Sequence, residues 1–428
     1  MLLAQHSIKG TFSPPEDYKF ALLYKVTPTV SVYVKNAEIK KDGRFTLPLD
    51  STNTKGIYRL VYAVPQEDYN FDIIYNGKED IELTFNSETG VDFIKSVENR
   101  MLASYTTSMS KVTQSIGNYY HQESKDTLAL KAIFKAQRDT QLSYEKAANG
   151  MMAVHFIKAN KPYIPKKFET VATYTKNLKT HFFDAVDFNN QTLLSSNFLT
   201  EKMLNYVFGV SADDKSKFAN YKKNIDVFCK VVKPISTEIK RNLLTELWQQ
   251  MVDLNYEEVA NYLAETYLMD MAVSLNDQQL LKALITYKDT SIGSPAPDFS
   301  LEIKKDGKKI SKKLSELNIA NTYIVVFWSS ECSHCTVEIP RLQAFLKTKE
   351  KESIKVIAVG LEDDDKLWKE KIKEFPEFIH VLGLDKWKND IGNSYVVTAT
   401  PTYFILNKDK HIVAKPENFD FLRAFFKK

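Results

Sequence analysis

Two cysteines three residues apart, directly after a run typical of a buried strand, constrain the fold of this chain more than any other feature. The apolar run Thr322–Trp328 is followed by a short polar loop and then by Cys332-Ser333-His334-Cys335. Beyond the second cysteine, residues 337–347 show the apolar spacing of a helix. We therefore expect a strand–loop–helix unit that carries both sulfurs where its helix begins.

Strands and helices alternate around this unit, which is typical of an α/β domain. The stretch at 291–297 is dense in Gly, Pro and Ser, which suits a domain boundary, and we assign residues 288–428 to the domain. The further elements that we expect are strands at 354–359, 402–406 and 411–413 and helices at 366–374 and 419–426.

The preceding residues predict two other domains. Residues 1–90 contain alternating runs around Asp42-Gly43 and Asn76-Gly77, which are hairpin signals, so we expect a small antiparallel β domain of sandwich type. Residues 91–287 almost lack turn dipeptides and repeat apolar side chains at spacings of three and four, which predicts an all-helical block. The fold class is therefore multidomain, with β, all-α and α/β parts in chain order.

Composition excludes several classes of protein. The formal net charge is only +4 over 428 residues, so we expect no nucleic-acid partner. Three cysteines are too few for a small domain held together by disulfides. No window approaches the roughly 18 apolar residues that a transmembrane helix needs.

The first five residues, Met1–Gln5, form an apolar run that closes on a small residue, as a signal peptide does at its end. We interpret them as a truncated signal peptide; the alternative is a short apolar terminus that packs on the fold. Export would place the protein in the periplasm or cell envelope, where a cysteine pair can alternate between dithiol and disulfide.

The cysteine pair itself indicates redox chemistry. Cys332 is expected at a helix N-terminus, where unpaired N–H groups and the helix dipole stabilise a thiolate, so we assign it as the nucleophile and the more shielded Cys335 as the resolving thiol. His334 lies between them and is expected to lower the pKa of Cys332 further, which makes the couple more oxidising. The pair serves as the redox centre, and we expect no other cofactor.

Alternatives to this chemistry have less support. A zinc site would need a second ligand pair, and we expect no metal; a static structural disulfide is the other alternative. Cys229 is interpreted as a buried small hydrophobe. Peroxidase chemistry would need a proline where Val325 stands. The acidic run at 362–365 precedes a predicted helix, so we expect it to cap and solvate that helix rather than bind a cation.

The segment 293–428 resembles the thioredoxin superfamily, specifically the TlpA/ResA-like thiol-disulfide oxidoreductases of bacterial envelopes. Four motifs carry the resemblance: Ala296-Pro297-Asp298-Phe299, Phe327-Trp328 with the cysteine pair, Glu338-Ile339-Pro340, and Thr398-Ala399-Thr400-Pro401-Thr402. The resemblance implies a thioredoxin-like fold and an enzyme that exchanges its dithiol with client proteins.

The same resemblance assigns roles to further residues. It implies that Pro401 follows a cis bond and faces the cysteines, and that Thr400 and Trp328 help to bind the client; a proline at a strand start also leaves an open edge for a client backbone. Thioredoxin itself has a buried aspartate where Val326 stands, so we assign Glu338, one turn beyond Cys335, as its proton acceptor; the alternative is a solvated helix glutamate.

The front two-thirds of the chain resemble N-terminal extensions of some TlpA-like proteins. The expected roles are client docking, homodimerisation through the N-terminal or helical domain, or anchoring near the membrane. The family implies a reductase fed by a membrane thiol donor, whereas His334 favours an oxidant. A disulfide isomerase or oxidase, and a client-binding or assembly module with a subsidiary redox domain, therefore remain as alternatives.

Overall fold

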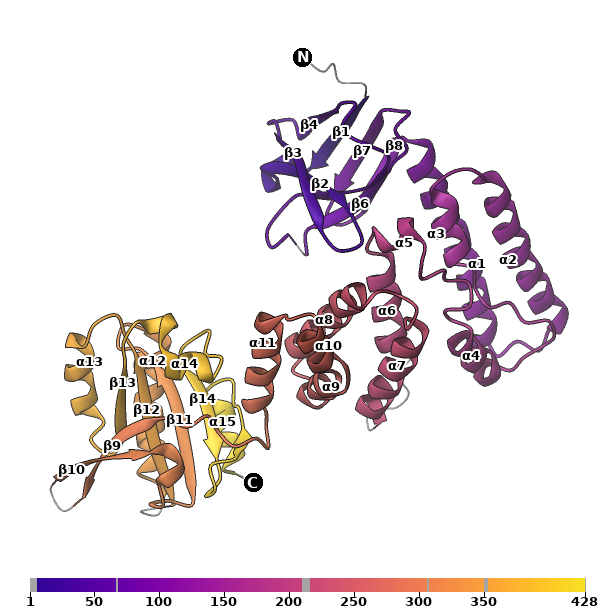
Figure 1. The fold of residues 1–428 in the computed structure, drawn as a ribbon. Coiled ribbons are helices and arrows are strands. Elements are labelled where there is room, and N and C mark those ends of the chain that lie inside the picture. The colour runs from indigo at the N-terminus through magenta and orange to yellow at the C-terminus, as the bar shows by residue number, and fades with distance from the viewer. Residues whose placement is uncertain (1–5, 67, 210–215, 306–307, 350–352, 428) are drawn as a thin grey trace. The chain divides into compact units, whose positions relative to one another are not determined.

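The structure is a computed structural model that describes residues 6–66, 68–209, 216–305, 308–349 and 353–427. The apolar run at 1–5 lies outside the described residues. The chain divides into two compact units, Met1–Gln250 and Met251–Lys428. The first unit holds the β domain and most of the helical block, and the second holds the last helices with the α/β domain (Figure 1). No helix in the described part of the chain is long and apolar enough to cross a membrane.

The β domain consists of two four-stranded sheets with strand orders β4-β1-β7-β8 and β3-β2-β5-β6. Their apolar faces share one core, which includes Ile8, Phe12, Leu23 and Tyr58. The strands are β1 (His6–Ser13), β2 (Phe20–Val26), β3 (Ser31–Glu38), β4 (Arg44–Leu49), β5 (Gly56–Val61), β6 (Asn70–Tyr75), β7 (Ile81–Asn86) and β8 (Gly90–Lys95).

Three details of this domain differ from the sequence prediction. The turns at Asp42-Gly43 and Asn76-Gly77 do not close hairpins, because β3 and β4, and likewise β6 and β7, belong to different sheets. The pairing of β1 with β7 is parallel, whereas the other pairs of the two sheets are antiparallel. Strand β8 also extends the domain to Lys95, past the expected boundary at 90.

The helical block is all-α over its described residues, as predicted. Side-chain caps begin several of its helices; Asp126, for example, accepts hydrogen bonds from the N–H groups of Leu128 and Ala129. The helices of the first unit are α1 (Val97–His121), α2 (Thr127–Ala147), α3 (Ala153–Ala159), α4 (Val171–Thr180), α5 (Gln191–Leu194), α6 (Phe198–Phe208), α7 (Lys217–Val231) and α8 (Thr237–Asp253), whose end reaches into the second unit.

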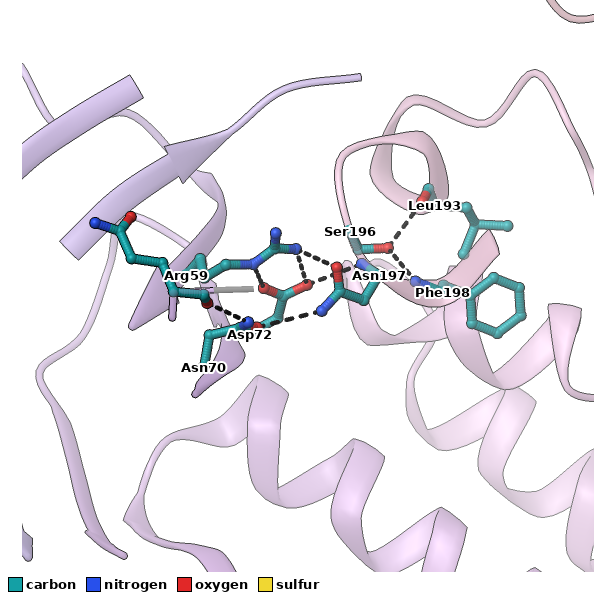
Figure 2. A network of polar contacts seen from close by, with 8 residues as sticks. Arg59, Asn70, Asp72, Leu193, Ser196, Asn197 and Phe198 are labelled. Carbon is teal, nitrogen blue, oxygen red and sulfur yellow. Dashed lines mark hydrogen bonds and ion pairs between the residues drawn. The ribbon is translucent and has the colours of Figure 1, made fainter. Parts of the chain in front are cut away.

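A polar network joins the β domain to the helical block within the first unit (Figure 2). Arg59 on β5 donates to Asp72 on β6 over 2.9 Å, and Asp72 accepts from the backbone N–H of Asn197 over 3.0 Å. The Asn197 side chain also reaches Asn70. Because the Arg59 and Asp72 side chains are each only 20% exposed, this pair is screened less than a surface ion pair and helps to fix the contact.

The second unit begins with α9 (Glu257–Leu263), a π-helical turn (Ala264–Leu268), α10 (Met269–Ser274) and α11 (Gln278–Asp289). The Gly/Pro/Ser stretch that follows is held by backbone hydrogen bonds from Gly293 to Ile412 and from Ala296 to Lys410. An ion pair between Glu257 and Lys415 ties α9 to the α/β domain. The predicted boundary segment is therefore anchored rather than free.

The α/β domain is built on a five-stranded sheet of order β13-β12-β11-β14-β15, in which β11 is central (Figure 1). β11, β12 and β13 are mutually parallel. β14 runs antiparallel to β11, and β15 runs antiparallel to β14. The elements are β9 (Ser300–Lys305), β10 (Lys308–Lys313), β11 (Thr322–Trp328), α12 (Ser333–Leu346), β12 (Ile354–Leu361), α13 (Lys366–Lys371), β13 (Ile379–Gly383), α14 (Asp390–Ser394), β14 (Thr402–Leu406), β15 (Ile412–Ala414) and α15 (Phe419–Phe425).

Both faces of this sheet are covered, which explains the unbroken apolar run of β11. Tyr323, Val325 and Phe327 enter one core, together with residues of β9 and Tyr395. Their alternate neighbours, including Trp328, enter a second core with residues of α12, α13 and α15. The cysteine pair follows the carboxyl end of β11; Cys335 is part of this second core, and Cys332 packs against it.

Candidate active site

Cys332 is the N-cap of α12, and its sulfur contacts one hydrogen-bond donor and one acceptor. The Cys335 N–H donates to the Cys332 Sγ over 3.3 Å, and the Cys332 thiol donates to the Thr400 carbonyl oxygen over 3.2 Å. Partial burial opposes ionisation, but the hydrogen bonds that the sulfur accepts, the one from Cys335 foremost, outweigh it, so the pKa of Cys332 is lowered. Cys332 thus has the solvent access and the acidity that a nucleophilic thiol needs.

Cys335 has the opposite character. It is fully buried one helical turn further on, and burial, with a contribution from the Cys332 hydrogen bond, raises its pKa to about 12. Both thiols are free in this structure. An accessible acidic thiol beside a buried weakly acidic one is the asymmetry that attack followed by resolution requires.

The imidazole of His334 is exposed, and it is the backbone N–H of His334 that helps to lower the pKa of Cys332. Any residue except proline would supply that N–H at this position. The expected effect of the ring therefore finds no support in the geometry.

The Thr400-Pro401 bond is cis and places the Thr400 carbonyl beside the Cys332 sulfur. Trp328, by contrast, is only 2% exposed and packs against Phe375 in the core beneath the cysteines. The expectation that Trp328 touches a client is corrected by this placement: its ring supports the site from below, since it continues the inward alternation of β11.

Glu338 lies on α12, one turn beyond Cys335, and is half-buried. Its Oε2 accepts hydrogen bonds from the Tyr403 hydroxyl over 2.9 Å and from the backbone N–H of Phe419 over 3.0 Å. Burial raises the pKa of Tyr403, and the charge of Glu338 and the nearby Cys335 raise it further. Tyr403 therefore interacts with both the Glu338 carboxylate and the buried thiol of Cys335.

Tyr403 was not among the site residues predicted from the sequence. The register of β14 could have indicated it, because Tyr403 pairs with Val326, the position at which thioredoxin carries its buried aspartate. A residue opposite Val326 points to the same face of the sheet and therefore enters the core that holds Cys335.

Glu362 is also misplaced by the sequence analysis, which assigned it to a solvated helix cap. It directly follows β12, is 3% exposed, and accepts hydrogen bonds from the Ser330 N–H over 2.6 Å and from the Ser330 and Ser329 hydroxyls. Desolvation raises the pKa of Glu362 in spite of these bonds, and the charge of Glu331 adds to the shift. Only its acidic neighbours at 363–365 stay outside the core, as expected.

Two further predictions concern other ligands and the third cysteine. Cys229 on α7 was expected to be a buried small hydrophobe, but it is only half-buried. Burial, with a contribution from the charge of Asp226, raises its pKa to about 12. Among the described residues, no group of three or more His, Cys, Asp or Glu side chains is placed to hold a metal ion.

Comparison with known proteins agrees with this geometry. The AhpC/TSA family matches residues 292–415. Thiol-disulfide oxidoreductase ResA of Bacillus cereus is 27% identical over 124 residues, which are 29% of this chain and 68% of the relative. The enzyme of the same name from Geobacillus kaustophilus is 27% identical over 28% of this chain and 67% of its own.

Residues 292–415 thus form a domain that resembles the TlpA/ResA-like proteins of the thioredoxin superfamily. The protein is a thiol-disulfide oxidoreductase. Among solved structures, a thioredoxin-like protein from Bacteroides caccae covers 62% of this chain and 96% of its own at 17% identity, with a TM-score of 0.41.

Within this TlpA/ResA-like domain, three elements converge on the cysteines. α12 with its N-cap carries both thiols and Glu338, β14 with the two residues before it supplies Thr400, Pro401 and Tyr403, and Glu362 after β12 holds the loop before Cys332. The arrangement can attack a disulfide with one sulfur and release it with the other.

Proposed function

We propose that this oxidoreductase works as a reductase of client proteins in the periplasm or cell envelope. The observation that carries the proposal is the asymmetry of the pair: Cys332 is accessible with a lowered pKa, and Cys335 is buried with a pKa raised to about 12. The Cys332 thiolate attacks a client disulfide and forms a mixed disulfide, releasing one client thiolate. Cys335 then attacks Cys332, which frees the second client sulfur.

Two electrons pass to the client in this sequence, and the domain is left with a Cys332–Cys335 disulfide. Cys335 must lose its proton before it attacks, and we assign Glu338, which shares Tyr403 with the buried thiol, as the acceptor. A membrane thiol donor returns the domain to the dithiol state. The open edge at Thr400 binds the client backbone while its cysteine faces Cys332.

The reducing direction follows from the resemblance to the TlpA/ResA-like oxidoreductases. Because the hydrogen bonds at Cys332 act in the opposite direction, we expect a potential of roughly −250 to −180 mV, between thioredoxin and the strong oxidants.

A glutathione redox titration of the full chain tests the direction. A midpoint near about −120 mV, the value typical of DsbA, would assign the protein to disulfide formation instead. Mixed disulfides trapped on a Cys335→Ser variant in envelope fractions would identify the clients, and a matched Cys332→Ser variant should trap none. A Cys335→Ser variant that captures no protein would contradict client exchange.

A further inference from the structure

The turn between β13 and α14 exposes two large apolar side chains that the redox chemistry does not use. Leu384 is 45% exposed and Trp387 is 47% exposed. Tryptophan contributes binding energy at protein interfaces more often than most residues, whereas a tryptophan in the open surface of a soluble protein is uncommon. Trp387 lies in a single 3-10 turn, Lys386–Lys388, which presents its ring outward.

The backbone of this turn is held in an unfavourable conformation. Asp385 and Lys386 are consecutive non-glycine residues with φ angles of 66° and 43°, in the left-handed region that L-residues rarely adopt. Residues held in such conformations cluster at binding and catalytic sites, because surrounding contacts must maintain them. Here those contacts come from Glu362, the residue that follows β12 and also bonds the loop before Cys332.

Glu362 provides these contacts. Its backbone N–H donates to the Gly383 carbonyl over 2.9 Å, and its carbonyl accepts from the Lys386 N–H over 3.2 Å. Its carboxylate holds Ser330, two residues before the nucleophile. In addition, the Lys386 ammonium lies 3.6 Å from the carboxylate of Glu331, the residue directly before Cys332. The exposed turn is thus fixed to the loop that carries the nucleophile.

We propose that Leu384 and Trp387 form a docking ledge for the client polypeptide, a recognition surface that rests on the proposed client exchange. The ledge follows β13, two strands from β11, so it lies about 10 Å to the side of the Cys332 loop. An extended chain advances about 3.3–3.6 Å per residue. The ledge therefore selects clients with an apolar or aromatic side chain about three residues from the reacting cysteine.

Continuity with the catalytic surface is the reason for assigning a client to the ledge. The opposite side of Cys332 is bordered by Thr400, whose carbonyl already contacts its sulfur. A client held at Thr400 on one side and at the ledge on the other crosses the nucleophile in an extended form, so recognition and attack use one segment of chain.

The test compares a protein disulfide with a small one, using the full chain. We expect Trp387→Ala to raise the KM for insulin reduction about fivefold or more, the effect of losing an interface hot spot, with kcat and the redox midpoint unchanged. Reduction of the small disulfide 5,5′-dithiobis(2-nitrobenzoate) should keep its rate, because this probe is too small to span the ledge. Leu384→Ala should act in the same direction, more weakly.

Phe425→Ala is the matched control. Phe425 is 38% exposed, and its neighbour Phe426 packs on Phe345 near the end of α12 that is remote from Cys332. An unchanged KM for insulin in Trp387→Ala, or an equal loss with both probes, would overturn the ledge. Failure of the proposed function would look different, since the unmodified protein would then fail to reduce insulin while its accessible thiol still reacts with the small probe.

Discussion

Replacing Glu362 with glutamine should change how the stability of the second unit depends on pH. The carboxylate is 3% exposed, and desolvation raises its pKa above the ordinary value of 4.5. The folded protein therefore binds this proton at pH values where the unfolded chain has already released it. Stability contributed by the neutral acid is complete below pH 4.5 and is lost as the pH rises through the higher folded pKa.

The size of the effect follows from the same linkage. Each unit between the folded and unfolded pKa of Glu362 removes about 1.4 kcal/mol of the free energy of unfolding. Glutamine does not titrate, and its carbonyl oxygen can still accept the bond from the Ser330 N–H. The free energy of unfolding of the native protein relative to Glu362→Gln should therefore fall as the pH rises from 4.5 through the higher folded pKa of Glu362 and stay level above it.

Urea unfolding followed by tryptophan fluorescence measures this, since Trp328, Trp368 and Trp387 all lie in the second unit. Glu362→Ala is the comparison variant: it leaves the Ser330 N–H without its acceptor and should cost about 1–3 kcal/mol at every pH. Identical pH profiles for the native protein and Glu362→Gln would refute the buried-acid reasoning.

Three further predictions concern the thiols. Iodoacetamide at neutral pH should label Cys332 of the reduced protein before Cys335 and Cys229, whose pKa values are both raised to about 12; mass spectrometry of digests checks the order, and faster labelling of either of the latter would contradict it. His334→Ala should leave the pKa of Cys332 within about half a unit, whereas His334→Pro removes the N–H and should raise it; the pH dependence of thiolate absorbance at 240 nm separates the two. Glu338→Gln should slow resolution of the mixed disulfide about 10²-fold or more and leave the alkylation rate of Cys332 unchanged; equal resolution rates would remove Glu338 from proton transfer.

The parts of the site that local sequence determines were predictable. A buried strand, a short loop and a helix start place Cys332 as an N-cap whatever the remaining chain does, and α12 begins where the cysteine spacing indicates. The alternation along β11 likewise predicts a strand covered on both faces. The cis bond at Thr400-Pro401 was expected from the family resemblance and is present.

Features that depend on pairing between distant segments were not predictable in the same way. Asp42-Gly43 and Asn76-Gly77 do reverse the chain, but turn chemistry does not decide which strand lies alongside, and in both cases the next strand joins the opposite sheet. Tyr403 and Glu362 reach the active site through sheet register, so their roles appear only when β12 and β14 are placed beside β11.

The burial of Glu362 links catalysis to recognition. Its side chain accepts hydrogen bonds from the loop before Cys332, and its main chain holds the turn that carries Trp387, so one residue fixes both segments at the carboxyl edge of the sheet. An apolar residue would avoid the desolvation cost but would leave the Ser330 N–H without an acceptor. Aspartate, shorter by one methylene, would keep the main-chain bonds to the turn but would bring its carboxylate less far toward the Ser330 N–H. The length of glutamate at this position is therefore explained by its bonds to the loop before the reacting sulfur, and its main chain connects that loop to the proposed docking ledge.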